Sequence, residues 1–161
     1  MSSILKVDQL QDSGGNAIIT SNGSGTFTSS LPNTGITMAD GWRLTASTNQ
    51  GTDGDVTTNW ERVDTDGYGS LGTGLTESSG IFSFPQTGYY HINFTARLTV
   101  DNGDSTASVL IQTTTDNSTY NQAVVMSAGN LGTADIAATS TGNFIFDVTN
   151  TSTHKFKLTT S

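Results

Sequence analysis

The feature that most constrains the fold of this chain is a strict two-residue alternation between Tyr90 and Val100. Such a period places successive side chains on opposite faces of a sheet, whereas a helix would repeat every 3.6 residues. We therefore predict one long strand with two different faces. The core face carries Tyr90, Ile92, Phe94, Ala96 and Leu98. The polar face carries His91, Asn93, Thr95 and Arg97, and it meets either solvent or another subunit.

Other short segments with strand-like patterns follow one another along the chain, and turn-rich stretches such as "GTDGD", "DTDGYGSLGTG" and "DNGDS" separate them. No stretch has useful helical periodicity. Strands at this spacing without crossover helices favour an antiparallel sandwich or barrel. In residues 144–148 both faces carry apolar groups, which predicts burial on two sides. The segments are "GWRLTAS", "VTTNWERVD", "GIFSFP", "TASVLIQTTT", "TYNQAVVMSA", "TADIAATSTGNFIFDVT" and "THKFKLTTS".

The first part of the chain differs in sequence pattern from the rest. Two short apolar pieces, residues 4–10 and 17–20, flank the turn signal Ser-Gly-Gly-Asn at residues 13–16. They predict a small hairpin or extended arm, which is too small to be stable alone and is expected to dock on something. The Gly/Ser/Thr stretch at residues 22–30 is typical of a flexible link. We therefore divide the chain into an N-terminal arm and linker, 1–34, and a main domain, 35–161.

Composition excludes several partners and compartments. The formal charge is -8 and only six residues are Lys or Arg, so a nucleic-acid backbone is not an expected partner. The absence of cysteine excludes disulfides and thiolate metal sites. The N-terminus has no apolar signal-peptide core, and no run approaches the roughly 20 apolar residues of a membrane span. We expect assembly in a cytoplasm and no membrane partner.

Catalytic chemistry finds little support in the sequence. His91 and His154 are the two histidines, and both fall on strand patterns, which favours surface or interface positions. No G-x-S-x-G elbow is present, and "GYGSLGTG" lacks the G-K-[ST] ending of a phosphate-binding loop. We expect no enzyme activity and no cofactor. Trp42 and Trp60 are interpreted as core or interface residues, with sugar stacking as the alternative.

Pairs of carboxylates in glycine-containing turns give a weak calcium hypothesis. Carboxylate oxygens are the ligands that Ca²⁺ prefers, but aspartate is also a common turn former, which is the favoured interpretation. An EF-hand would need a glutamate at its twelfth position, and the loop that starts at Asp64 has Leu75 there. The candidate ligands are Asp64, Asp66, Asp101 and Asp104, with Asp53 and Asp55 forming a further pair.

Residues 80–92, "GIFSFPQTGYYHI", resemble the G-x-F-x-x-P-x-x-G-x-Y-x-I signature of C1q/TNF-like jelly rolls. The resemblance implies an antiparallel jelly roll, a core strand after the second glycine and a compact homotrimer. It also implies a final strand beside the first one. Either residues 154–161 include that strand, or it comes from elsewhere, or the sequence is incomplete. The matching positions are Gly80, Phe82, Pro85, Gly88, Tyr90 and Ile92.

A second resemblance covers roughly the first hundred residues. "ILKVDQLQDSGGNAIITSNGSG", "ADGWRLTAS" and "NWERVDTDGYGSLGTGLTESSGIFSFPQTGYY" resemble, in this order, virion structural proteins of marine tailed bacteriophages. This resemblance implies a trimeric capsid decoration or cement protein whose arm binds the major capsid protein or another virion protein. The alternative is a tail-fibre or receptor-binding module for a host glycan. The arm residues expected to dock are Ile4, Leu5, Val7, Leu10, Ile18 and Ile19.

Overall fold

The computed structural model describes residues 6–29, 35–48, 54–130 and 132–161. Backbone contacts divide the chain into two compact units, Met1–Thr37 and Met38–Ser161. We call them the N-terminal unit and the main unit. Both are built from antiparallel strands, and no helix occurs in the described residues. The all-β class predicted from the sequence is therefore confirmed.

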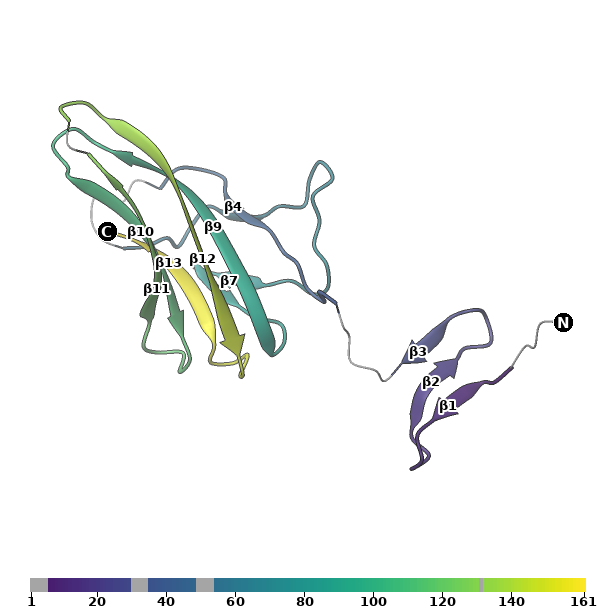
Figure 1. Cartoon of the computed structure of the whole chain (residues 1–161). Helices are drawn as coiled ribbons and strands as arrows, with labels where there is room; N and C mark the ends of the chain where they lie inside the picture. Colours follow the sequence, from purple (N-terminus) through teal and green to yellow (C-terminus); the bar gives the residue numbers. More distant parts are fainter. Residues whose placement is uncertain (1–5, 30–34, 49–53, 131) are drawn as a thin grey trace. The chain divides into compact units, whose positions relative to one another are not determined.

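The N-terminal unit is a three-stranded antiparallel meander in the order β1-β2-β3 (Figure 1). The hairpin expected around residues 13–16 is present. Asp12 closes its turn, because Oδ1 accepts hydrogen bonds from the backbone N–H groups of Gly14, at 2.8 Å, and Asn16, at 2.9 Å. The strands are β1 (Gln9–Gln11), β2 (Ala17–Ser21) and β3 (Phe27–Ser29).

The prediction of a flexible link over residues 22–30 is wrong, because this stretch closes a second hairpin and contains β3. The Asn22 side-chain oxygen accepts hydrogen bonds from the N–H groups of Ser24, at 2.8 Å, and Thr26, at 3.2 Å. Gly23 and Gly25 adopt positive φ angles of 76° and 86°, which residues with a side chain rarely tolerate. The glycines therefore serve a tight turn between strands.

The main unit contains a large antiparallel sheet in the order β11-β10-β13-β8-β7, with β5 also paired to β13. Two further pairs are the long ribbon β12-β9 and the short hairpin β4-β6. The strands are β4 (Trp42–Leu44), β5 (Gly54–Asp55), β6 (Trp60–Arg62), β7 (Thr76–Ser78), β8 (Ile81–Ser83), β9 (Gly88–Val100), β10 (Thr106–Thr114), β11 (Asn121–Gly129), β12 (Ile136–Val148) and β13 (Lys155–Thr160).

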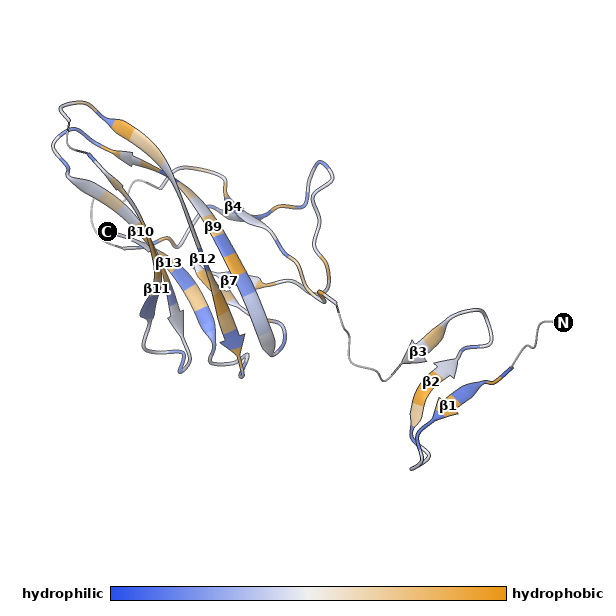
Figure 2. Ribbon diagram, viewed as in Figure 1, coloured by the Kyte–Doolittle hydropathy of each residue, from blue (hydrophilic) through white to orange (hydrophobic). Residues whose placement is uncertain are grey.

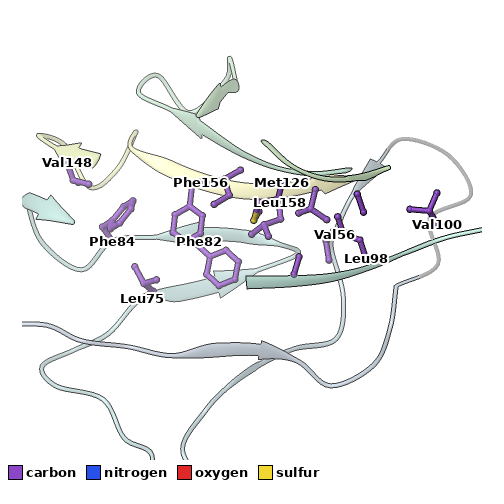
Figure 3. Close-up of a cluster of buried hydrophobic side chains, with 14 residues drawn as sticks. Val56, Leu75, Phe82, Phe84, Leu98, Val100, Met126, Val148, Phe156 and Leu158 are labelled. Atoms are coloured by element: carbon purple, nitrogen blue, oxygen red, sulfur yellow. The ribbon is translucent and has the colours of Figure 1, made fainter. Parts of the chain in front are cut away.

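The core lies between the large sheet and the β12-β9 ribbon (Figures 1 and 3). Phe82 on β8 is 2% exposed, and its ring stacks on that of Phe156 on β13 with centroids 4.8 Å apart. The ribbon approaches β11 closely at Gly142, where a Cβ atom would lie 2.5 Å from Cγ1 of Val124. The buried apolar residues are Val56, Leu75, Phe82, Phe84, Ala96, Leu98, Val100, Val109, Ile111, Met126, Ala128, Val148, Phe156 and Leu158.

The β4-β6 hairpin is held to the main unit by aromatic contacts and a buried charge. The rings of Trp42 and Trp60 both meet Phe82 edge to face, at 5.5 and 5.0 Å. The Asp40 side chain is 1% exposed, forms an ion pair with Arg62 at 3.1 Å and accepts a hydrogen bond from the Leu75 N–H at 2.7 Å. A buried carboxylate is costly unless it is paired and hydrogen-bonded. The contacts of Asp40 with Arg62 and Leu75 therefore hold the segments that carry these three residues together.

Two details of the sheets differ from the sequence-based expectation. Residues 144–148 were predicted to be buried on both sides, yet the Ile145 side chain is 72% exposed. Phe144 and Phe146 pack against the core, and strand alternation turns Ile145 to the other face. The short strand β5 was interpreted as a turn, because its two residues carry no alternation that the sequence would show.

Candidate functional site: two exposed sheet faces

The N-terminal unit has one apolar and one polar face, and its register determines which residues share each face. Leu10 pairs with Ile19, and Phe27 pairs with Ser21, two residues further along β2. Leu10, Ile19 and Phe27 therefore lie on the same side, which we call the apolar face of the N-terminal unit. Leu10 is 52% exposed and Phe27 is 67% exposed.

The opposite face of this small sheet is polar. Gln9, Thr20 and Thr28 form one cross-strand row, and the Gln9 Nε2 donates a hydrogen bond to the Thr20 Oγ1 at 3.3 Å. Within residues 6–28 no side chain is fully buried. Figure 2 shows hydrophobic colouring on β2 and β3 of this unit. Over its described residues, the unit thus has regular strands and ordered turns but no core.

The structure places the predicted docking residues unequally. Ile4 and Leu5 lie outside the described residues. Leu10 and Ile19 come together on the apolar face, while Val7 precedes β1 and is exposed. Ile18 lies at the β-bulge where the register between β1 and β2 shifts. Sequence reasoning missed Phe27, although its position between threonines in "TFTS" was a strand signal that the surrounding glycines and serines obscured.

The second exposed face is the outer side of the β12-β9 ribbon. His91, Asn93, Thr95 and Arg97 are exposed there, and Thr99 continues the row. On the inner side, Ala96 and Leu98 are buried, while Tyr90, Ile92 and Phe94 are half-buried against the same core. The alternation of β9 therefore separates a core-facing side from a fully accessible side.

β12 supplies half of this outer face, and sequence reasoning did not name its residues. His91 lies opposite Ile145, and Asn93 lies opposite Asn143. Thr95 and Thr141 lie opposite each other with their hydroxyl oxygens 3.2 Å apart, a hydrogen-bonding distance. The signal that could have found these partners is the matched length of two strands of 13 residues, since each alternates over its whole extent.

One end of the outer face is markedly apolar. Tyr89 is 78% exposed and lies opposite Asp147, next to the pair formed by His91 and Ile145. The formal charges of the whole face are those of Arg97 and Asp147, which cancel. This face therefore has no net charge in a strongly acidic chain, which makes it suitable for contact with another acidic molecule.

A shallow recess of about 330 Å³ lies over β5, β10 and β13. Beside it, the Lys157 Nζ lies 2.8 Å from the Asp55 carboxylate and 4.6 Å from the centre of the Tyr120 ring. Burial, and then the charge of Asp55, raise the pKa of the Tyr120 hydroxyl. The lining is mostly polar or backbone: Gly54, Asp55, Leu110, Gln112, Thr159, Thr160 and Ser161.

The other histidine and the two tryptophans singled out in the sequence pack within the main unit. The prediction of a surface or interface position is wrong for His154, because its side chain is buried and stacks on Phe146 at 5.6 Å. Its ring nitrogens lie 3.2 Å and 3.1 Å from the hydroxyl oxygens of Thr149 and Thr153. The indole N–H groups of Trp42 and Trp60 donate to the Asp40 carboxylate and the Val56 carbonyl. Both tryptophans are half-buried against the core, as the favoured interpretation held.

Most described aspartates of the calcium hypothesis lie in turns or loops, whereas Asp55 is part of β5. Asp66 has a φ angle of 55°, and the Asp101 carbonyl accepts a hydrogen bond from the Asp104 N–H at 3.1 Å. In the described part of the chain, no three histidine or acidic side chains come close enough to hold a metal ion. Asp53 lies outside the described residues.

Comparisons with known proteins do not assign the chain to a group. No family model matches the sequence, and no curated protein matches it either. Over the residues that the structure describes, no helix is long and apolar enough to cross a membrane. The apolar face of the N-terminal unit and the outer face of the β12-β9 ribbon are therefore the main evidence on function.

Proposed function

We propose that this chain is a non-enzymatic virion structural protein: a homotrimeric capsid decoration protein that the N-terminal unit attaches to the particle. The observation that carries the proposal is the contrast between a main unit with its own core and a small sheet without one. A three-stranded sheet in which residues 6–28 include no buried side chain gains little from folding alone, which supports a binding partner.

A more specific fold for the main unit fits this proposed function. We propose that its facing sheets form a C1q/TNF-like jelly roll, in which Gly88 precedes the core strand β9. Gly88 has a φ angle of 148°, and Gly80, at 82°, lies so close to β5 that a Cβ atom would be 2.3 Å from the Val56 carbonyl oxygen. Both positions of the family signature therefore have backbone angles that favour glycine, and Gly80 also leaves no room for a side chain.

In the proposed trimer, the outer face of the β12-β9 ribbon contacts neighbouring copies. A ribbon of 13 residues is roughly 43 Å long, at about 3.3 Å per residue. Its lack of net charge avoids the repulsion that acidic surfaces would impose on one another. We expect assembly to depend weakly on salt, because apolar burial and neutral hydrogen bonds are screened little.

Single cysteines offer a direct test of this contact, since the chain contains no cysteine of its own. Tyr89→Cys on the outer ribbon face is expected to form an intermolecular disulfide under mild oxidation, seen on a non-reducing gel. Ser78→Cys, exposed on β7, is the matched control and should remain uncross-linked. Equal cross-linking of both variants would contradict the assigned interface.

Attachment is tested by comparing the full chain with the fragment 38–161, which retains the whole core. Capsids of the virus that encodes the chain, assembled without it, are mixed with each protein and sedimented. The full chain should co-sediment and the fragment should not. If the fragment binds as tightly as the full chain, attachment through the N-terminal unit is wrong.

The recess beside Asp55 favours a second candidate function, a receptor-binding module for a host surface glycan. Amide, hydroxyl and carboxylate groups of this kind recognise sugar hydroxyls, and the adjacent Tyr120 adds an aromatic surface. Under this alternative, a glycan array gives a signal that Gln112→Ala abolishes. The decoration role predicts no array signal.

A further inference from the structure

The apolar face of the N-terminal unit indicates which of its side chains would contact the particle. This inference rests on the proposed function. Leu10, Ile19 and Phe27 share one face, while Gln9, Thr20 and Thr28 occupy the other. We propose that only the first face touches the particle. The partner is an uncharged, apolar patch of protein surface that is repeated symmetrically on the capsid.

The charge of the unit indicates the chemistry of its partner. Residues 1–37 carry Lys6, Asp8 and Asp12, a net charge of -1, whereas the other -7 lies on residues 38–161. Asp12 is also occupied by its own turn, since it accepts hydrogen bonds from Gly14 and Asn16. Asp8 borders the face beside Ser21, whose N–H donates to the Asp8 carbonyl. The side chains at the centre of the face, Leu10, Ile19 and Phe27, are suited to apolar burial rather than to a charged surface.

The size of the face explains why the partner must be repeated. β2 has five residues, so the face is about 16 Å long and, across three strands, about 14 Å wide. This footprint of about 230 Å² is far below the roughly 800 Å² that each partner buries in a standard stable interface. A single unit therefore binds weakly, and a trimer binds strongly only where three such patches lie within reach of its three units.

The ordered turns prepare this face for binding. Asp12 and Asn22 each close a hairpin through two side-chain to backbone hydrogen bonds, so both connections are fixed by contacts within the unit. Pre-organised turns lower the ordering cost of binding, although the strands still need a covering surface. On this face Phe27 is more exposed than Leu10, at 67% against 52%, and we place it at the centre of the contact.

The test compares adjacent residues on opposite faces of β3, using the full chain and capsids assembled without it. Phe27→Ser should weaken binding about 100-fold or more, because the loss recurs in each of three units. Thr28→Ser should change it less than about threefold. Phe27→Leu, which keeps an apolar side chain, should restore binding to within about tenfold of the original protein.

Each outcome has a distinct meaning. If Phe27→Ser binds like the original chain, or if both serine variants lose binding equally, the assignment to the apolar face is overturned while attachment by the unit stands. If binding is abolished at every variant, including Phe27→Leu, a specific apolar contact is also overturned. If the unaltered chain does not bind capsids at all, the proposed function itself fails.

Discussion

The N-terminal unit and the main unit close their turns in the same way, yet among the described residues only those of the main unit form an interior. Both contain antiparallel strands, and both close turns with an aspartate that accepts backbone N–H groups: Asp12 in the first unit and Asp116 in the second. In the main unit, Phe82 is 2% exposed, whereas Phe27 in the N-terminal unit is 67% exposed. Ordered strands therefore do not imply independent stability, which depends on the burial of side chains between sheets.

The largest expected effect is the truncation of an aromatic side chain in each unit. Phe82→Ala removes a ring that contacts Trp42, Trp60 and Phe156, so it should lower the free energy of unfolding by about 3–5 kcal/mol. Phe27→Ala should leave the melting of the main unit within about 0.5 kcal/mol of the original value. Chemical denaturation followed by tryptophan fluorescence measures both. Equal losses would remove the distinction between the units.

A smaller effect on the free energy of unfolding should distinguish the two ion pairs of the β4-β6 hairpin. Asp40→Ala leaves Arg62 and the Leu75 N–H without their buried partner, which is expected to cost about 3 kcal/mol. Arg43→Ala breaks the exposed pair with Glu61, 2.8 Å long, and should cost less than about 1 kcal/mol. Urea titration of both variants is the measurement. Similar costs would show that burial does not decide the stability of this hairpin.

The smallest effect concerns the aspartate turns and their pH dependence. Hydrogen bonds from the Thr119 N–H, the Thr114 hydroxyl and the Ser118 N–H hold the pKa of Asp116 well below its usual value of 3.8. A lowered folded-state pKa contributes stability above the unfolded value, and this contribution is lost as the pH falls through the folded one. Asp116→Asn should therefore destabilise the main unit at pH 6, and the difference should shrink below about pH 3.8.

The matched control for this turn lies in the other unit. The side chain and then the backbone N–H of Asn16 lower the pKa of Asp12 in the same way. Because the N-terminal unit has no core, Asp12→Asn should not alter the melting of the main unit at any pH. Thermal melts between pH 2 and pH 6 compare the variants. A pH-dependent shift in Asp12→Asn would indicate that the two units unfold together.

The main strands could be predicted because their alternation is long. Residues 90–100 alternate strictly between apolar and polar side chains. In residues 136–148 most apolar side chains lie on the inner face, although Ala137 and Ile145 lie on the outer one. Prediction failed where strands are short or rich in glycine: β5 has two residues, and β3 follows the turn "NGSG". A flexible link and a tight hairpin turn have the same composition, and only the φ angles of Gly23 and Gly25 distinguish them.

The candidate site was predicted in part for a related reason. Alternation assigns His91 and Arg97 to one side of their strand, but it does not reveal that Ile145 lies across from His91. Such pairing depends on contacts between residues far apart in sequence, which a local pattern does not contain. In the N-terminal unit, Leu10 and Ile19 were predicted from their apolar character, whereas Phe27 joined them only through the register of β3.

Hydrogen exchange on the free full chain tests the central claim most directly. The backbone N–H groups of the N-terminal unit should exchange within seconds, because no side chain of residues 6–28 is buried, while those around Ile111 and Phe156 should stay protected for hours. On capsid binding, protection should appear in residues 9–29 and leave the main unit unchanged. Protection of β2 equal to that of β10 in the free chain would contradict the account, since it would show a unit that is stable without a partner.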